Sequence, residues 1–449
     1  MTRSPSYRHW IATGLAHAFL ADAAQAGARS AAALRARAAQ SLGRDAPWLQ
    51  PLATAVATEF SRRWEWHTVP TLAAWLCELP QFDDAFDPEH DQPRVRRLLL
   101  RPARMARAPY ALEGLRPPRW HTPADLAAWL GTPLERLAWL MGRAHDFRET
   151  QADRSLSAHY HPLLKPKRSG GLRLVEIPKP ELKQVQQRLL SGLLDAIPTH
   201  EGAHGFVRGR SAISHAREHA GQAVVIAYDL RDFFNSIGVA RIRALWRTLG
   251  YAEGVAEALA RLTTTRTPLA VRERLLDDGG VDFRGAKRLA SRHLPQGAPT
   301  SPALANLCAF GLDLRLEGLA WRFGAHYSRY ADDIVFSGPR ELATRSGVLH
   351  AWVEAIVQAE GFVLHPRKTR RMPAHRRQQV TGIVVNERPN LARDAYDRLR
   401  ARLHACAAGG CDAETWTRLQ GQVGWACQLV AASRAQKLQR MLAAVPVLR

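Results

Sequence analysis

Tyr327-Ser-Arg-Tyr-Ala-Asp-Asp-Ile-Val-Phe-Ser-Gly338 places two adjacent carboxylates, Asp332 and Asp333, between two short apolar runs. Far upstream, Asp229 ends another apolar run. Two acids at a tight turn and a third from a neighbouring strand can form one cage of oxygen ligands. Such ligands are the ones that Mg²⁺ prefers in proteins. The sequence therefore predicts a site for two Mg²⁺ ions, which Mn²⁺ could also occupy.

A pair of such ions can stabilise both the attacking and the leaving oxygen of an in-line phosphoryl displacement. The alternative for Asp332 and Asp333 is an ordinary hairpin turn, in which Asp is favoured. The flanking apolar runs favour the metal site. Asp232 is left out of the metal set, because a surface or helix-capping role explains it equally well.

The composition agrees with a nucleic-acid partner. The chain has 449 residues, with 63 Lys+Arg against 41 Asp+Glu, a net charge of +22 and a pI near 10.8. Such a surplus favours binding to polyphosphates with a strong dependence on salt, although an arginine-rich proteome gives the same bias. The length indicates two or three domains, and 46% hydrophobic residues are enough for packed cores.

Cysteine usage and hydropathy favour a cytoplasmic protein. The stretch from Trp10 to Ala26 is partly similar to a secretory signal, but His17 and Asp22 interrupt it, so we expect an amphipathic helix. No run of 18 apolar residues occurs, and no membrane contact is expected. The five cysteines are odd in number and lack Cys-x-x-Cys spacing, which predicts reduced and mostly buried thiols: Cys77, Cys308, Cys406, Cys411 and Cys427.

Periodicity and turn residues predict a mixture of helices and strands. Thr122-Pro123 and Thr132-Pro133 each begin a short helix. Ser169-Gly170-Gly171 closes a hairpin between strands at 161–165 and 172–177. We expect further helices over 181–194, within 239–290, over 302–319 and 346–360, and from 394 onward. Further strands are expected at 224–228, 326–330, 334–336, 362–364 and 380–385.

Several segments resemble the motifs of reverse transcriptases and occur in the family's order. Tyr327–Gly338 resembles the catalytic hairpin, and Asp229–Ile237 resembles the first metal-binding strand end. Leu294–Asn306 resembles the segment that contacts the incoming nucleotide and the template. Lys167–Arg173 resembles the fingers hairpin, and Gly361–Thr369 resembles the later palm element that ends in Lys-Thr.

Within that family the chain resembles the bacterial retron enzymes, a branch similar to group II intron enzymes. Val380–Asn386 contains the Val-Thr-Gly motif of the retron group, and Leu419–Trp425 also resembles its members. The resemblance covers about residues 120–449. Between Ile237 and His293 there is no Asn-Ala-x-x-His, a motif that many retron enzymes carry, which leaves the retron subtype open.

The resemblance implies an α+β fold of the right-hand polymerase type, with fingers, a palm built on an antiparallel sheet, and a helical thumb. The expected divisions are a helical N-terminal extension of unassigned role (1–115), a helical lead-in (116–150), fingers (151–223), a palm (224–392) with a helical fingers insertion (239–290), and a helical thumb (393–449).

The resemblance also implies roles for single residues. Asp229, Asp332 and Asp333 would be catalytic, with the first two bridging both metal ions and Asp333 and the Leu230 carbonyl assisting at one. Lys167 and Arg173 would grip the triphosphate, where Arg offers a bidentate geometry that Lys lacks. Their alternative is a solvated basic hairpin. Lys368 would contact phosphate or act as a general acid towards pyrophosphate.

Further residues would contact the sugar, the template and the primer. Phe234 would lie under the sugar and exclude a 2′-hydroxyl, with core packing as its alternative. Gln296 would hydrogen-bond near the sugar, and Gly297 would allow close backbone approach, unless both simply form a loop before a helix. The residues expected at the template and primer are Arg208, Arg210, Tyr330, Thr381 and Gly382.

The function implied by this resemblance is synthesis of single-stranded DNA (msDNA) from a structured noncoding RNA, with dNTPs as substrates, in defence against phage. Expected partners are that RNA and its DNA product, an effector or toxin protein, and host RNase H. One alternative is another prokaryotic reverse transcriptase, either intron-derived or a template-independent defence polymerase. A second is an RNA–DNA-binding scaffold that restrains a toxic effector.

Overall fold

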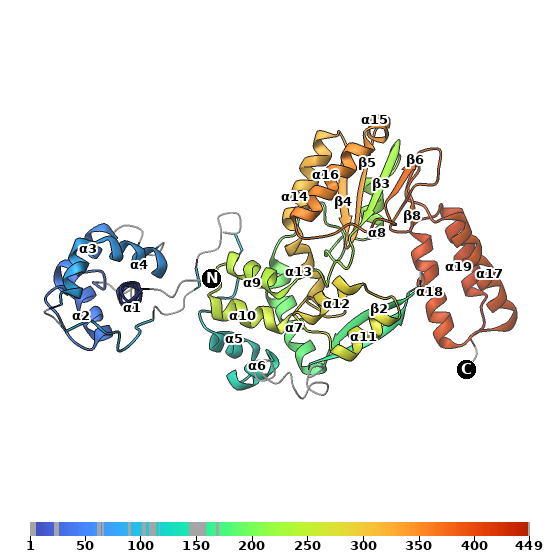
Figure 1. Cartoon of the computed structure of the whole chain (residues 1–449). Helices are drawn as coiled ribbons and strands as arrows, with labels where there is room; N and C mark the ends of the chain where they lie inside the picture. The colour runs from blue at the N-terminus through green and yellow to red at the C-terminus, as the bar shows by residue number, and fades with distance from the viewer. Residues whose placement is uncertain are drawn as a thin grey trace. The chain divides into compact units, whose positions relative to one another are not determined.

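The computed structural model describes residues 6–21, 27–60, 64, 67–88, 91–100, 105–106, 114–115, 117–142, 159–167 and 170–447. The chain divides into two compact units, Met1–Arg104 and Met105–Arg449 (Figure 1). Within the ranges described, no helix combines the length and the apolarity needed to cross a membrane.

The first unit is helical. Its elements are α1 (Tyr7–Leu20), α2 (Ala31–Leu42), α3 (Leu49–Glu59), α4 (Val69–Glu78) and the 3-10 helix η2 (Pro80–Phe86). Side-chain caps fix where the helices begin: the Ser30 hydroxyl accepts a hydrogen bond from the Ala33 amide, and Thr68 forms a capping box with Thr71.

Helix α1 differs from the expected amphipathic helix, because apolar and small residues on most of its circumference are buried. It lies against both α2 and α4, so two neighbours cover it and little of it faces solvent. Helix α1 therefore lies at the centre of the hydrophobic core of the first unit. Its buried residues are Ile11, Ala12, Gly14, Leu15, Ala16, Ala18, Phe19 and Leu20.

The second unit begins with the expected helical pair and hairpin. Helix α5 (Pro123–Leu130) starts with a Thr122 capping box and ends at Gly131, whose φ of 64° is left-handed. The other elements of this part are α6 (Leu134–Leu140), β1 (Tyr160–Pro166), β2 (Leu172–Pro178), α7 (Pro180–Gly192), the 3-10 helix η5 (Leu194–Ala196) and α8 (Ala212–Glu218). Strands β1 and β2 pair antiparallel; Ser169 of the expected turn lies outside the described residues.

A four-stranded sheet in the order β4-β5-β3-β6 forms the centre of the second unit. Its strands are β3 (Val224–Asp229), β4 (His326–Tyr330), β5 (Asp333–Gly338) and β6 (Arg370–Pro373), and all paired neighbours are antiparallel. Strand β3 is buried along its whole length, because its alternate residues enter two different cores. This sheet, with helices packed around it, confirms the expected α+β class.

Helices α14 (Phe310–Arg322) and α16 (Ser346–Ala359) lie side by side along this sheet (Figure 1). They are accompanied by α13 (Ser301–Cys308) and α15 (Arg340–Thr344). The expected single helix over 302–319 is therefore wrong: the chain breaks at Ala309, between α13 and α14. Both helices bury apolar faces, so the apolar run alone does not mark the break.

The expected strand at 362–364 is also wrong, apart from one isolated bridge between Leu230 and Leu364. This segment packs as a loop across the end of β3, since the Arg231 amide donates to the Val363 carbonyl oxygen at 2.8 Å. The fourth strand is instead β6. Its sequence, Arg370-Arg-Met-Pro373, has little apolar pattern.

The remaining helices form two groups. The insertion contains α9 (Val239–Thr248), α10 (Glu253–Leu262), α11 (Leu269–Asp277) and α12 (Phe283–Ala290). The C-terminal group contains α17 (Arg393–Gly409), α18 (Ala413–Cys427) and α19 (Ala432–Ala443), around a core that includes Leu403, Leu419 and Leu438. Between the groups, the expected strand at 380–385 is a short hairpin of β7 (Gln379–Val380) and β8 (Ile383–Val384).

Candidate active site

The three predicted acids lie at one end of the central strands. Asp229 is the last residue of β3 and stands opposite Asp333, the first residue of β5, in the strand register. Asp332 lies in the turn between β4 and β5, and its carbonyl oxygen accepts a hydrogen bond from the Leu230 amide at 2.8 Å. Antiparallel pairing thus brings together residues that are distant in sequence.

The acids at the turn destabilise one another's charge. Burial raises the pKa of Asp332, and the nearby Asp229 carboxylate raises it further. Burial, with repulsion from Asp332 and Asp229, raises the pKa of Asp333 from 3.8 to about 6. The site therefore holds negative charge that favours a cation.

Lys368 supplies a positive charge in this structure. Its Nζ donates a hydrogen bond to Asp229 Oδ2 at 2.8 Å, and the His365 amide donates to the Asp229 carbonyl oxygen at 2.8 Å. Among the described residues, no three His, Cys, Asp or Glu side chains are arranged to hold a metal ion. The donor chemistry still fits a hard divalent cation, because the carboxylates repel one another and supply only oxygen ligands.

The two basic residues of the hairpin lie near this acidic site. Arg173 is exposed on β2, and Lys167 Nζ donates to the Gly280 carbonyl oxygen at 3.0 Å. Burial lowers the pKa of Lys167; Asp232 opposes this effect, whereas Arg173 and Lys368 reinforce it. The charges of Lys368 and Arg173 in turn oppose the rise in the pKa of Asp332 that burial and Asp229 cause. The expected phosphate-binding cations and the acids therefore share one electrostatic environment.

An aromatic group borders the acids. Phe234 is half-buried, and its ring centroid lies 5.5 Å from that of Phe233 and 6.1 Å from that of Phe206. Phe206 is 53% exposed, has a left-handed φ of 62°, and lies 6.3 Å from the Tyr330 ring. Phe234 therefore lies between the buried Phe233 ring, in an edge-to-face contact, and the exposed Phe206 ring.

Gly297 packs closely against strand β2. Its φ is 130°, and a Cβ atom there would lie 2.9 Å from Val175 Cγ1 and 3.0 Å from the Glu176 carbonyl oxygen. Glycine is thus required by close packing on β2. In the same loop, the Gln296 carbonyl oxygen accepts a hydrogen bond from the Glu176 amide at 2.8 Å.

The residues expected at the template lie on loops. Arg208 is exposed, whereas Arg210 Nη1 donates to the carbonyl oxygens of Glu201 and Ala203 and so braces its own loop. Thr381 and Gly382 form the left-handed turn between β7 and β8, with φ of 45° and 84°. The Thr381 hydroxyl reaches the Ala212 carbonyl oxygen at 3.5 Å, which places the turn beside the start of α8.

A buried ion pair that sequence reasoning missed supports the acidic turn. Arg329 is fully buried; its Nε and Nη2 donate to the two carboxylate oxygens of Asp313, both at 2.7 Å. Arg329 Nη1 donates to the Ala331 carbonyl oxygen at 2.9 Å and to Asn306 Oδ1 at 3.1 Å. In the sequence, Arg329 lies in a short predicted strand and Asp313 in a predicted helix that also carries Arg315 and Glu317, so neither residue indicates its partner.

This network also attaches the turn to the loop before α8. The His204 amide donates to the Arg329 carbonyl oxygen at 2.8 Å, and Asn306 Nδ2 donates to the Gly205 carbonyl oxygen at 2.9 Å. A Cβ atom on Gly205 would lie 2.5 Å from the Ala331 amide nitrogen, so only glycine fits there. The backbone around Asp332 is thus held from two sides.

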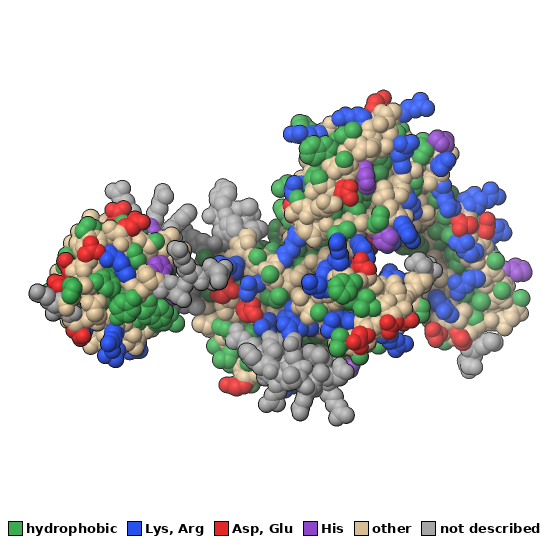
Figure 2. Space-filling model, in the orientation of Figure 1, with side chains coloured by type: hydrophobic (Ala, Val, Ile, Leu, Met, Phe, Trp, Pro, Cys, Tyr) green, Lys and Arg blue, Asp and Glu red, His purple; other side chains and the backbone are tan. Residues whose placement is uncertain are grey.

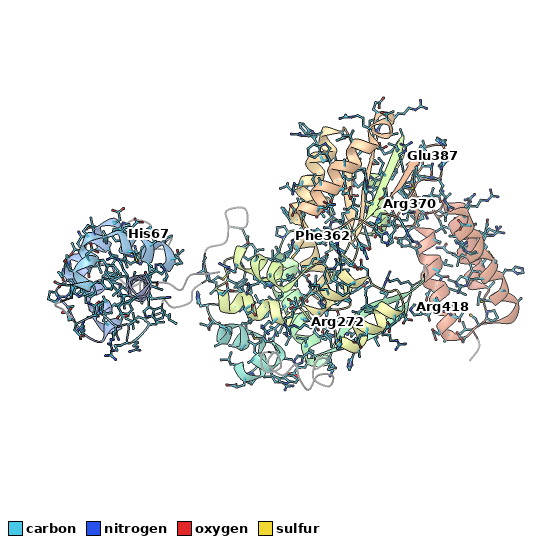
Figure 3. The ribbon with its side chains drawn as sticks, in the orientation of Figure 1. His67, Arg272, Phe362, Arg370, Glu387 and Arg418 are labelled. Carbon is cyan, nitrogen blue, oxygen red and sulfur yellow. The ribbon has the colours of Figure 1, made fainter. Side chains whose placement is uncertain are left out.

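Basic side chains extend beyond the acidic turn. Figure 2 shows Lys and Arg side chains around α12 and beside the hollow next to α18. Arg370 lies on β6 and Arg418 on α18 (Figure 3). Between α17 and α18 a groove of about 460 Å³ is lined by Leu391, Ala395, Arg398, Leu399, Arg402, Arg418, Gly421, Gln422, Trp425 and Ala426.

Residues 165–385 match the family described as Reverse transcriptase (RNA-dependent DNA polymerase). The matched range contains the acids, the hairpin and the Lys368 loop. With the mixed helix and sheet content, it confirms the right-hand polymerase fold expected from the sequence. The division into fingers, palm and thumb at the bounds given above stays a prediction.

The chain is similar in sequence to several bacterial retron reverse transcriptases. Retron Mx65 reverse transcriptase of Myxococcus xanthus is 41% identical over 289 residues, which are 64% of this chain and 63% of the relative. Retron Mx162 reverse transcriptase of the same organism is 39% identical over 67% of this chain and 62% of the relative. Retron Ec86 reverse transcriptase of Escherichia coli is 29% identical over 53% of this chain and 66% of the relative. The chain thus spans less than two thirds of each.

Proposed function

This chain belongs to the reverse transcriptase family, in its bacterial retron branch, and we propose that it synthesises single-stranded DNA from a structured noncoding RNA by nucleotidyl transfer. The convergence of Asp229, Asp332 and Asp333 at one sheet end carries this proposal. Primer extension on an RNA template with dNTPs tests it directly: wild-type protein should extend the primer, and a protein without extension would contradict it.

The acidic turn would act through a bound divalent metal, Mg²⁺ in this proposal. Asp229, Asp332, Asp333 and the Leu230 carbonyl would hold the metal, whose charge would favour ionisation of the primer hydroxyl and departure of pyrophosphate. Mn²⁺ would substitute for it. The buried Arg329 keeps the turn in place, so that the carboxylates are oriented before substrate arrives.

The basic side chains would bind the triphosphate. Arg173 offers a bidentate contact, and Lys167 adds charge from the turn of the same hairpin. Lys368 would exchange its contact with Asp229 for a phosphate, or protonate the pyrophosphate as it leaves. Gln296 would hydrogen-bond near the sugar from the adjacent loop.

Phe234 is proposed to select deoxynucleotides. Phe234→Ala would open space for a 2′-hydroxyl, so we expect discrimination against ribonucleotides, measured as a ratio of kcat/KM values, to fall on the order of 10²-fold. Phe310→Ala is the matched control, since that ring is 42% exposed on α14. Unchanged discrimination in the Phe234 variant would assign its ring to packing alone.

The groove between α17 and α18 is proposed to hold the template–product duplex in the manner of a thumb. Arg402 and Arg418 hydrogen-bond to the neutral side chains of Gln422 and Thr415, which leaves their charges available to phosphates. Trp425 is 39% exposed and offers a flat apolar contact in the same groove. Contacts of this kind detect A-form shape and 2′-hydroxyls rather than sequence.

Arg402→Ala should therefore weaken binding to an RNA–DNA duplex by about tenfold at moderate salt and reduce the salt slope by about one. Fluorescence anisotropy over a salt series measures both quantities. Trp321→Ala, at an 83% exposed position on α14, is a control for loss of a surface side chain elsewhere. An unchanged salt slope in the Arg402 variant would show that the groove between α17 and α18 does not contact the duplex.

The retron role extends the proposal to partners. We propose priming from a 2′-hydroxyl of a guanosine in the cognate RNA, template contacts through Arg208, Arg210, Tyr330, Thr381 and Gly382, and removal of template by host RNase H. An effector protein, anti-phage defence and a cytoplasmic location belong to the same proposal. The five free cysteines agree with that location.

Sequencing the nucleic acid that copurifies with the protein tests this role. Short single-stranded DNA linked to RNA is the expected finding, and its absence would favour an intron-derived or template-independent enzyme. An Asp332→Ala, Asp333→Ala double variant separates enzyme from scaffold. A scaffold that restrains an effector would keep its phenotype without DNA synthesis.

A further inference from the structure

A second buried polar cluster joins the hairpin to the loop that carries Gln296. It consists of Glu176 on β2, Thr267 before α11, and His293, which are 2%, 3% and 1% exposed. Glu176 Oε2 lies 3.0 Å from His293 Nε2, and Glu176 Oε1 lies 2.9 Å from the Thr267 hydroxyl. All three side chains are thus removed from water, and the Glu176 carboxyl group joins Thr267 to His293.

The hydrogen-bond partners restrict where protons lie in this cluster. His293 Nδ1 lies 2.9 Å from the Ser291 carbonyl oxygen, which can only accept, so Nδ1 carries a proton. One further proton lies between Nε2 and the Glu176 carboxyl group. The pair is therefore either imidazolium with carboxylate or neutral with neutral, and both forms satisfy every polar atom of the contact.

Backbone hydrogen bonds join the same segments that the side-chain cluster joins. The Glu176 amide donates to the Gln296 carbonyl oxygen at 2.8 Å. His293 and Thr265 exchange two backbone hydrogen bonds, at 2.9 and 3.0 Å. Arg272, labelled in Figure 3, donates from Nε to the Thr267 carbonyl oxygen at 3.1 Å. Strand β2, the start of α11 and the loop before α13 are thus one connected structure.

The two segments that this cluster joins each carry a residue proposed to bind the nucleotide. Arg173 lies on β2, the same strand as Glu176, and Gln296 follows His293 by three positions. We propose that Glu176 and His293 are positioning residues, which hold Gln296 at a fixed place relative to Arg173. The sugar-contacting loop and the triphosphate-binding strand then form a preformed nucleotide site. This inference rests on the proposed function.

Glu176→Ala and Glu176→Gln separate positioning from mere volume. Alanine leaves His293 Nε2 and the Thr267 hydroxyl without their partner. Glutamine restores both contacts, because its amide nitrogen can donate to Nε2 of a neutral His293 and its oxygen can accept from Thr267. We expect the alanine variant to raise the dNTP KM on the order of 10- to 100-fold with little change in kcat, and the glutamine variant to keep the wild-type KM.

Hydrogen exchange gives a readout that needs no catalysis. The Glu176 amide is protected by the Gln296 carbonyl, so His293→Ala should accelerate exchange at residues 175–177 in the full-length protein. Thr267→Val removes one contact only and should give a smaller change in the same direction, which keeps the test available if a stronger variant does not fold. The control is Glu257→Gln, which breaks the 2.6 Å ion pair with Arg261 on α10. This variant should change neither the hydrogen exchange at residues 175–177 nor the dNTP KM.

The outcomes distinguish this inference from the proposed function. If wild-type protein synthesises DNA but Glu176→Ala and His293→Ala keep its dNTP KM, the positioning role is wrong. A glutamine variant as impaired as the alanine variant would also overturn it. If the wild type does not synthesise DNA, the proposed function fails, and exchange at 175–177 still decides whether the cluster holds the loop.

Discussion

We expect Asp332→Asn and Asp333→Asn each to lower DNA synthesis on the order of 10³-fold or more, while the folded protein becomes more stable without divalent metal. Synthesis falls because each variant removes a charged metal ligand. Primer extension on an RNA template measures this loss, and urea denaturation in EDTA measures the change in the free energy of unfolding.

The gain in stability follows from the direction of the pKa shift. The pKa of Asp333 is raised from 3.8 to about 6, so its charged form is disfavoured in the folded state. This cost is absent below pH 4 and fully present above pH 6. At neutral pH, asparagine removes a cost of up to about 3 kcal/mol.

Mg²⁺ should reverse the order of stability. It binds the folded wild-type site and stabilises it by mass action, whereas the asparagine variants gain less. Asp232→Asn is the control, because Asp232 pairs with Arg288 and is not assigned to the metal. Equal stabilisation of wild type and Asp333→Asn by Mg²⁺ would contradict the assignment of this carboxylate.

Arg329→Met should lower the free energy of unfolding of the second unit by about 3 to 5 kcal/mol. The variant leaves the Asp313 carboxylate buried with its guanidinium partner removed, and the two side chains are both 0% exposed in the wild type. Urea denaturation followed by circular dichroism measures the loss. A variant as stable as wild type would show that the pair adds nothing to the fold.

A double variant tests whether the pair also orients the turn. Arg329→Met with Asp313→Leu replaces the ion pair by apolar side chains, which should recover part of the stability, because the Tyr327 hydroxyl loses the Asp313 carboxylate that accepts its hydrogen bond. DNA synthesis should stay low, because the Ala331 carbonyl oxygen and Asn306 lack the donor that Arg329 provides. Full synthesis by the double variant would reduce the role of Arg329 to stability.

The central strands were predictable from local sequence. Val224–Asp229 and Ile334–Phe336 are short, apolar and bounded by polar residues, as buried strands are, whereas His326–Tyr330 contains Ser328 and Arg329. The hairpin carries turn glycines and α5 carries the Thr122 capping box, whereas α6 begins at Leu134 after Pro133 without a side-chain cap. In contrast, β6 has two arginines and one proline in four residues and becomes a strand only by pairing with β3.

Contacts between residues that are far apart in the chain could not be predicted from local sequence. Lys368 was assigned to phosphate, but nothing in its local sequence indicates the hydrogen bond to Asp229. Gly297 was expected to allow close backbone approach, and its close packing against Val175 and Glu176 of β2 could not be inferred from the local sequence. The Arg329–Asp313 pair was missed because the two residues lie on different elements, and Asp313 is one of several charged residues in α14.

Anomalous scattering from a crystal of the protein with Mn²⁺ and a non-hydrolysable dNTP shows whether the three acids bind a divalent metal together. We predict metal density roughly 2.1 Å from carboxylate oxygens of Asp229, Asp332 and Asp333, with Lys368 moved from Asp229 to the nucleotide. Metal bound elsewhere, with Asp229 still paired to Lys368, would show that these three acids are not the metal ligands.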